Sequence, residues 1–145
     1  MRPAQILLAV AVLALAVPVT ALGRETGGRA APPTFAFGRT GGNILPFAVK
    51  IGRDGRIVAS GPVQVRSADV PLTLALRNGL ATLARAEGFF SMPVLIRCPG
   101  VLPDVAGRFV TVLASGKMRT VSARGTCNAS FEELYAVLSA VVGLG

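Results

Sequence analysis

The chain has 145 residues and a formal net charge of +8, with 15 Lys and Arg residues against 7 Asp and Glu residues. This length favours a single domain. The sequence contains no histidine, which excludes the commonest general base and the Ser–His and Cys–His nucleophile pairs. The basic residues form no run of three and most aromatic residues fall on apolar faces, so no specific nucleic-acid partner is predicted.

The first residues have the layout of a secretory signal peptide. Arg2 gives a short basic start, an apolar run follows from 6 to 17, and small residues then offer cleavage after Ala21 or Gly23. An uncleaved membrane anchor is the alternative, but the run is shorter than the ~20 residues that span a bilayer, and a proline then interrupts it. We predict a signal peptide over residues 1–21 and a mature chain that is secreted, or periplasmic or envelope-associated, without spanning a membrane.

The segment after the signal peptide differs in composition from the rest of the chain. Residues 22–34 are rich in Gly, Ala and Pro and show no hydrophobic periodicity, so we predict a disordered lead-in. The folded part is then residues 35–145, a length that supports one modest hydrophobic core.

Two β-hairpins are predicted in the folded part. In the first, residues 47–51 alternate apolar and polar side chains, and Asp54-Gly55 has the residue types of a tight type I′ turn before the return strand 56–60. The second turns at Ser115-Gly116, and its first strand is apolar on both faces, as in a strand buried on both sides. Further strands are predicted at 35–39 and 94–98.

A helix is predicted after each hairpin. In the first helix, apolar residues recur at helical spacing, Ser67 or Asp69 can cap the start, and Gly88 suits the end. Its predicted buried face consists of Leu72, Ala75, Leu76, Gly79, Leu80 and Leu83. In the second helix, Ser130 and Glu133 have the spacing of a capping box. Its predicted buried stripe consists of Phe131, Leu134, Tyr135, Leu138 and Val141 or Val142.

These elements indicate an α+β domain in which two helices pack on one face of an antiparallel sheet of four to six strands. A shift that places Val49 on Val110 also places Gly55 on Gly116, which is compatible with two duplicated ββα units. The matches are few and mostly apolar, so a chance likeness of two ββα segments stays open.

Cys98 and Cys127 are the only cysteines of the chain. In an oxidising compartment an even number of cysteines indicates a disulfide, and closing the loop between them would contribute about 3–4 kcal/mol. A zinc site would need carboxylates in place of histidine, and the spacing is not that of a thiol-exchange motif. We therefore predict one disulfide that ties a strand end to the last helix, with no metal and no cofactor.

The carboxylates of the folded region each have a structural explanation as turn, cap or helix-end residues. They are Asp54, Asp69, Glu87, Asp104, Glu132 and Glu133. A carboxylate-dyad hydrolase is the remaining enzymatic alternative, although no spacing in the sequence points to a dyad. The sequence therefore favours a protein that is not an enzyme.

Several segments together resemble small exported bacterial proteins of unknown function. These segments are the Asp-Gly hairpin, the Cys-Pro-Gly segment at 98–100 with Pro103-Asp104 after it, and the closing helix with Cys127, Phe131 and Leu134-Tyr135. The resemblance covers residues 35–142. It implies export, an α+β layout and paired cysteines, and it implies no activity and no site.

The primary functional hypothesis is a non-catalytic module that binds another extracytoplasmic protein, as an inhibitor does. The segment 99–107 is rich in Pro and Gly and is anchored by Cys98, and binding loops are often made rigid in this way. Its candidate binding residues are Val101, Leu102 and Asp104. The alternative is that the segment is a plain connection.

A second hypothesis is an envelope-associated protein that binds an anionic wall polymer or lipid. The contact would be made by basic residues near the two predicted hairpin turns, namely Arg53, Arg56, Lys117 and Arg119. Binding of this kind must weaken as the ionic strength rises.

Overall fold

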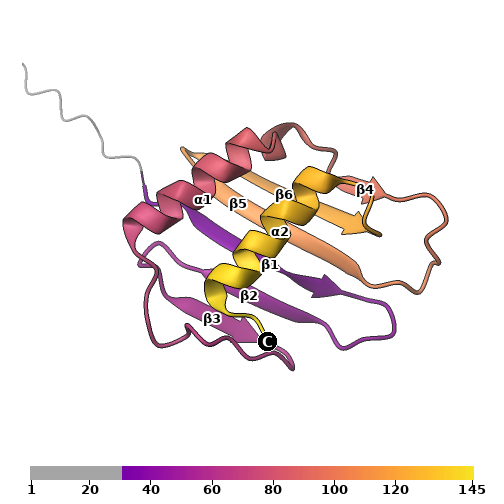
Figure 1. The fold of residues 1–145 in the computed structure, drawn as a ribbon, viewed down its shortest axis with the longest axis horizontal. Coiled ribbons are helices and arrows are strands. Elements are labelled where there is room, and N and C mark those ends of the chain that lie inside the picture. Colours follow the sequence, from indigo (N-terminus) through magenta and orange to yellow (C-terminus); the bar gives the residue numbers. More distant parts are fainter. Residues whose placement is uncertain (1–30) are drawn as a thin grey trace, which may run out of the picture.

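A computed structural model describes residues 31–145 (Figure 1). The predicted signal peptide and the lead-in up to residue 30 lie outside the described residues. In chain order the elements are β1 (Thr34–Thr40), β2 (Phe47–Ile51), β3 (Ile57–Ser60), α1 (Leu74–Ala86), the 3-10 helix η1 (Phe89–Ser91), β4 (Leu95–Arg97), β5 (Gly107–Ala114), β6 (Lys117–Arg124) and α2 (Ala129–Val142). The architecture is α+β with one disulfide, as the sequence predicts.

One sheet of six strands runs in the order β3-β2-β1-β5-β6-β4. All neighbours are antiparallel except β4 and β6, which are parallel. The sheet is therefore mixed, whereas the sequence predicts a purely antiparallel one. The reason is the order of the strands. β4 and β5 run in opposite directions, and β6 turns back from β5 into the space between them, so β6 must run along β4.

Both helices cover the same face of the sheet (Figure 1). Alternate residues of the central strands point toward the helices. Phe37 of β1 lies between its register partners Val49 and Val110, and all three are fully buried. Branched and aromatic side chains in this alternation suit a sheet with one buried face. Neither α1 nor α2 covers the opposite face of the sheet.

Both predicted hairpins are present, as β2–β3 and β5–β6. The first turn is not the expected type I′, because Gly55 has a positive φ of 82° and Asp54 does not. The Gly55 N–H donates to Gly52 O and the Gly52 N–H donates to Arg56 O, which is the pattern of a type I turn closed by a glycine bulge. The Asp54 carboxylate accepts from the Arg56 N–H and so stabilises this turn.

Helix α1 begins later than the sequence predicts. Its cap is Thr73, whose hydroxyl accepts from the Leu76 N–H, so the expected caps Ser67 and Asp69 lie before the helix. Leu76, expected inside, is exposed. The helix is therefore rotated relative to the predicted face, and its buried side chains are Arg77, Leu80, Ala81 and Ala84.

Arg77 lies on the buried side of this helix. The residue is 5% exposed, and its guanidinium donates to the carbonyl oxygens of Leu72 and Arg53. A buried guanidinium is tolerated when hydrogen bonds satisfy it, and its methylene stem adds apolar contact. Arg77 therefore joins α1 to the β2–β3 turn, a role that apolar periodicity does not reveal.

Helix α2 buries the predicted stripe, with Phe131, Leu134, Tyr135, Leu138 and Val142 inside. The predicted capping box is wrong, because Asn128 caps the helix by accepting from the Phe131 N–H and Ser130 lies in the first turn. Gly143 ends the helix with a positive φ of 63°. None of the described helices is long and apolar enough to cross a membrane.

The order ββα occurs twice, as β2-β3-α1 and β5-β6-α2. β2 and β5 are both antiparallel to β1 and so run in the same direction, but β3 and β6 lie on opposite sides of them. Because both helices cover one face (Figure 1), the two units have opposite hands. No rotation superposes objects of opposite hand, so the fold does not support a duplication of this unit.

Replacing Arg77 measures its contribution to the fold. We expect Arg77→Met to lower the free energy of unfolding by about 2–4 kcal/mol, because two carbonyl groups lose their donor inside the domain. Equilibrium unfolding in urea gives the value. Arg56→Met is the matched control, since the ion pair of Arg56 with Asp54 is exposed and such pairs contribute little. Equal losses in the two variants would contradict the role of Arg77.

Candidate functional site

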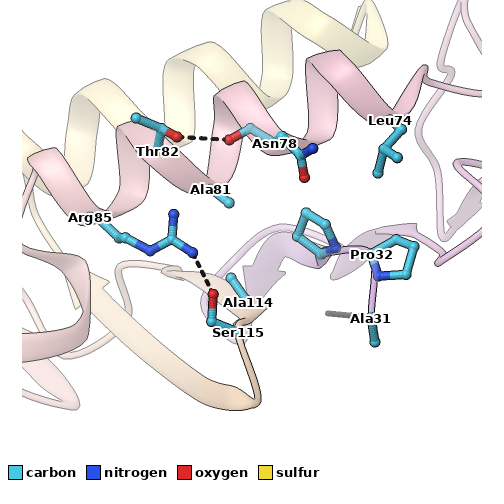
Figure 2. Close-up of a pocket in the computed structure, with 10 residues that line it drawn as sticks. Ala31, Pro32, Leu74, Asn78, Ala81, Thr82, Arg85, Ala114 and Ser115 are labelled. Atoms are coloured by element: carbon cyan, nitrogen blue, oxygen red, sulfur yellow. Dashed lines mark hydrogen bonds between the residues drawn. The ribbon is translucent and has the colours of Figure 1, made fainter. Parts of the chain in front are cut away.

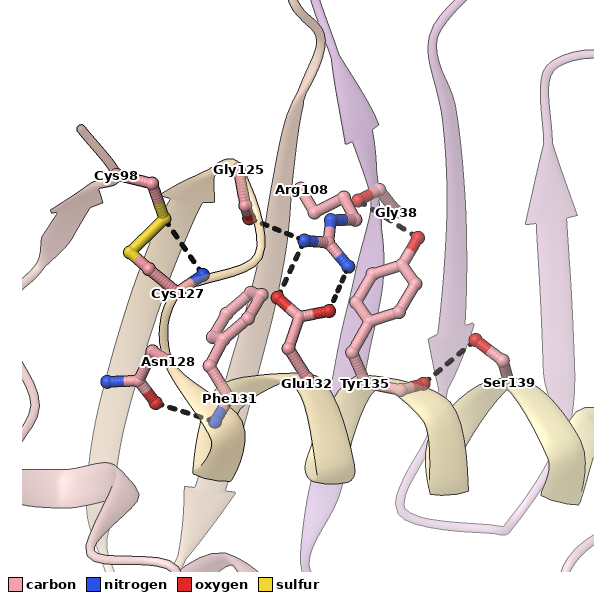
Figure 3. A network of polar contacts seen from close by, with 10 residues as sticks. All are labelled: Gly38, Cys98, Arg108, Gly125, Cys127, Asn128, Phe131, Glu132, Tyr135 and Ser139. Atoms are coloured by element: carbon pink, nitrogen blue, oxygen red, sulfur yellow. Dashed lines mark hydrogen bonds and ion pairs between the residues drawn. A yellow bond between two sulfur atoms is a disulfide. The ribbon is translucent and has the colours of Figure 1, made fainter. Parts of the chain in front are cut away.

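Cys98 and Cys127 form the predicted disulfide, with 5.5 Å between their Cα atoms (Figure 3). The bridge joins the end of β4 to the start of α2. Gly125 packs against it, since a Cβ atom there would lie 2.6 Å from both Cys98 Cβ and Val101 Cγ2. Gly125 also has a φ of 90°, which side chains disfavour. A glycine at this position therefore allows the bridge and the next loop to approach closely.

Arg108 of β5 also contacts the turn at Gly125 and the start of α2. Its guanidinium forms a bidentate ion pair with the Glu132 carboxylate and donates to Gly125 O at 2.7 Å (Figure 3). The ring centroids of Phe131 and Tyr135 lie 5.9 and 5.4 Å from its Cζ atom. Bidentate arginine–carboxylate pairs are strong and directional. One side chain therefore aligns β5, the turn before the disulfide and the first turn of α2.

Tyr135 lies next to this ion pair. Its hydroxyl donates to Gly38 O at 3.4 Å, and its side chain is buried. Burial raises the pKa of the Tyr135 phenol, and the positive charges of Arg39 and Arg108 oppose part of that shift. Tyr135 is consequently a neutral hydrogen-bond donor at physiological pH.

Two loops meet beside this network, loop 41–46 between β1 and β2 and loop 98–106 between β4 and β5. The side-chain amide of Asn43 donates to the Asp104 carboxylate at 3.0 Å. At Gly42, a Cβ atom would lie 2.5 Å from a backbone nitrogen and 2.6 Å from a backbone oxygen of loop 98–106, so the two backbones are in contact. The loops support each other, and Asp104 joins them.

Between the two loops lies a depression of about 540 Å³, which we call the two-loop site. Its lining combines polar side chains with exposed apolar ones. Leu102 is 66% exposed and Ile44 is 45% exposed, and Val105 lies in the same lining. Leu45, which is 72% exposed, follows Ile44 in loop 41–46. Large apolar side chains that remain exposed together on one concave surface are typical of contact sites for other molecules.

Arg39 contributes an unpaired charge to the two-loop site. Its guanidinium lies over the Phe47 ring, with Cζ 5.9 Å from the centroid. The ion pairs among residues 31–145 are those of Arg56 and Arg108, so Arg39 has no carboxylate partner there. A free guanidinium beside exposed apolar side chains can hold a carboxylate of a ligand.

Two of the four residues predicted for charge binding are engaged in contacts within the described part of the protein. Both hairpin turns lie at the end of the sheet away from the disulfide (Figure 1). Arg119 is half-buried and donates to the backbone carbonyl of Met92, and its buried Nε has no partner in the described part of the chain, so its side chain is less accessible than the sequence suggests. Arg56 pairs with Asp54 at 3.5 Å. Of the four residues predicted for charge binding, Arg53 and Lys117 are exposed and form no ion pair within residues 31–145.

The structure places the predicted loop residues around the two-loop site. Leu102 lines it, Asp104 holds its two loops together, and Val101 packs on the turn at Gly125. Sequence reasoning does not identify Arg39 or Ile44, because their segment is distant in sequence from the cysteines. Only the antiparallel pairing of β1 with β5 brings that segment beside loop 98–106.

A second depression, of about 410 Å³, lies between residues 31–33, α1 and the β5–β6 turn (Figure 2). Two of its polar side chains already form hydrogen bonds within the protein. Arg85 donates to Ser115 Oγ at 2.7 Å, and Thr82 Oγ1 donates to Asn78 O at 3.0 Å. The arginine of this lining is therefore already held by a hydroxyl of the β5–β6 turn.

Within residues 31–145, no three His, Cys, Asp or Glu side chains gather in a way that could hold a metal ion. Comparisons with protein families, with characterised proteins and with solved structures gave no match to this chain. The resemblance to small exported bacterial proteins therefore stays a prediction, and function has to be inferred from the geometry of the site.

The ion pair of Arg108 can be tested by removing one charge. We expect Glu132→Gln to lower the free energy of unfolding by about 1–3 kcal/mol, because Arg108 stays in place without its counter-charge. Glu133→Gln is the matched control, since Glu133 is the next residue of the same helix and is exposed. Urea unfolding compares the two variants. A loss in Glu133→Gln as large as in Glu132→Gln would count against the role of the pair.

Tyr135 is the only tyrosine of the chain, which has no tryptophan, so ultraviolet absorbance reports its ionisation directly. Because burial raises its pKa from the usual 10.0, the phenolate should form at higher pH in the folded protein than in urea. A raised folded pKa contributes stability that is present below the unfolded pKa and is lost as the pH rises through the folded pKa. The difference in unfolding free energy between the wild type and Tyr135→Phe should therefore become smaller above pH ~10. An equal pKa of Tyr135 in the folded protein and in urea would contradict this prediction.

Proposed function

We propose that this protein is an exported, non-catalytic binding module that holds a segment of another extracytoplasmic protein in the two-loop site. The observation that carries the proposal is the placement of exposed apolar side chains beside one guanidinium that has no carboxylate partner among the described residues. Leu102 and Ile44 supply the apolar contact, and Arg39 supplies the charge.

The two-loop site is held in shape before a partner arrives. The disulfide anchors loop 98–106, and the Asn43–Asp104 hydrogen bond together with the backbone contact at Gly42 anchors loop 41–46. A loop that is already ordered loses little conformational entropy on binding, so a given contact area yields a higher affinity. This rigidity favours recognition over a role as a plain connection.

The lining of the site defines the chemistry of the partner. An apolar side chain of the bound segment would pack against Leu102, Ile44 and Val105. A carboxylate next to it would accept from the Arg39 guanidinium, a charge-assisted contact that fixes orientation as well as affinity. The carboxylate can be that of Asp, of Glu or of a free C-terminus, so the proposed partner presents a short segment that is both apolar and acidic.

The location of the partner follows from two features. The pattern of residues 1–21 is typical of a signal peptide, and disulfides persist in oxidising compartments. The protein would therefore meet its partner in the periplasm, at the cell envelope or in the medium.

Selection of peptides from a random library on the purified, oxidised protein tests this proposal. We expect the selected peptides to combine a large apolar residue with Asp, Glu or a free C-terminus. Binding of these peptides to Leu102→Ser and to Arg39→Gln should be at least about tenfold weaker than to the wild type, because each variant removes one anchoring contact.

Met118→Ser is the matched control for this experiment. Met118 is 73% exposed, but it lies beside the β5–β6 turn at the opposite end of the sheet, so its replacement should leave peptide binding unchanged. Circular dichroism and thermal unfolding establish that each variant keeps its fold. Equal binding by the wild type and all three variants, or selected peptides that lack an acidic group, would overturn the proposal.

A further inference from the structure

The sheet face that the helices leave uncovered carries two arginines side by side at one edge. Arg97 of β4 and Arg124 of β6 are register partners in the parallel pair, and both are exposed. Neighbouring strands lie about 4.8 Å apart, and register partners point to the same side of a sheet. The preceding partners, Ile96 and Ala123, are buried, so the two arginines point to the uncovered face.

No carboxylate neutralises this pair within the described residues. The ion pairs there involve Arg56 and Arg108 only. No strand of the sheet contains an acidic residue, and Lys50 of β2 adds a further exposed cation. Like charges that face each other across neighbouring strands destabilise a sheet. An anion bound between Arg97 and Arg124 would remove this repulsion.

The two arginines line a depression of about 260 Å³, together with Val101, Leu102 and Pro103 and the disulfide residue Cys98. The backbone beneath them is fixed, because the Cys98 N–H donates to Arg124 O at 3.0 Å and the disulfide follows directly. The bases of both side chains therefore stay in place while the guanidinium groups adjust to a ligand.

We propose that Arg97 and Arg124 jointly bind an oxyanion of the phosphate or sulfate class. A single guanidinium occupies both oxygens of a carboxylate in a bidentate pair, whereas a tetrahedral oxyanion has enough oxygens to accept from two guanidinium groups. Its second negative charge also balances the second cation. This anion site differs from the two-loop site and does not depend on it, although Leu102 lines both depressions.

A titration with inorganic phosphate at constant ionic strength tests the anion site. We expect the NMR signals of the Arg97 and Arg124 Nε–H groups to shift until they saturate, with phosphate and with sulfate. Acetate should bind at least about tenfold more weakly, because it offers one negative charge and two acceptor oxygens where sulfate offers two charges and four oxygens. Arg97→Gln and Arg124→Gln should each weaken phosphate binding about tenfold or more.

Arg53→Gln is the matched control, because Arg53 is an exposed arginine at the β2–β3 turn and its loss should leave phosphate binding unchanged. Thermal unfolding checks the fold of each protein. Phosphate should raise the unfolding temperature of the wild type and of Arg53→Gln, and not that of the two site variants. Signals that shift without saturating, an equal response to acetate, or an equal loss in Arg53→Gln would overturn the anion site.

Vesicle sedimentation distinguishes two sources of the bound anion, a lipid headgroup and a soluble ester. Vesicles of phosphatidylcholine with and without phosphatidylglycerol are sedimented with the wild type and with Arg97→Gln. Sedimentation that requires both the anionic lipid and Arg97 supports the site and assigns a lipid headgroup. Saturable phosphate binding without sedimentation supports the site and assigns a soluble phosphate or sulfate ester. Neither result depends on peptide binding at the two-loop site, so the two proposals fail independently.

Discussion

The ion pair between Arg108 and Glu132 is the contact on which the disulfide end of the domain depends. It joins the centre of the sheet to α2, and the same guanidinium holds Gly125 O just before Cys127. Apolar packing is non-directional, so packing and the disulfide alone would leave α2 free to shift along β5. The bidentate pair removes that freedom, and loop 98–106 therefore has a fixed base.

Arginine has two uses in this protein. Arg77, Arg108 and Arg119 point inward and donate to backbone carbonyls. Guanidinium suits this use because its planar donors are directional and its stem is apolar. Part of the formal charge of +8 is therefore internal. The arginines that remain accessible around loop 98–106 are the ones that a ligand can reach, and both proposals rest on them.

Loop 98–106 separates the two proposed contact regions. The two-loop site, with Arg39, lies on one side of it, and the anion site, with Arg97 and Arg124, lies on the other. Leu102 lines both depressions. Because the disulfide fixes one end of the loop and the bond from Asn43 fixes it near the other, one short segment shapes two surfaces of different chemistry.

The two hairpins, the buried stripe of α2 and the paired cysteines could be predicted from the sequence, because alternation, helical spacing, turn glycines and cysteine number are local signals. The burial of particular polar residues could not be predicted in this way, because it depends on tertiary packing. Arg77 and Arg119 have the sequence character of surface residues, since a periodicity of apolar side chains contains no information about the carbonyl groups that a guanidinium can reach. The parallel β4 and the two-loop site were likewise decided by tertiary structure. Both depend on pairings between segments far apart in the chain, and such pairings are set by the fit of whole surfaces and not by any local pattern.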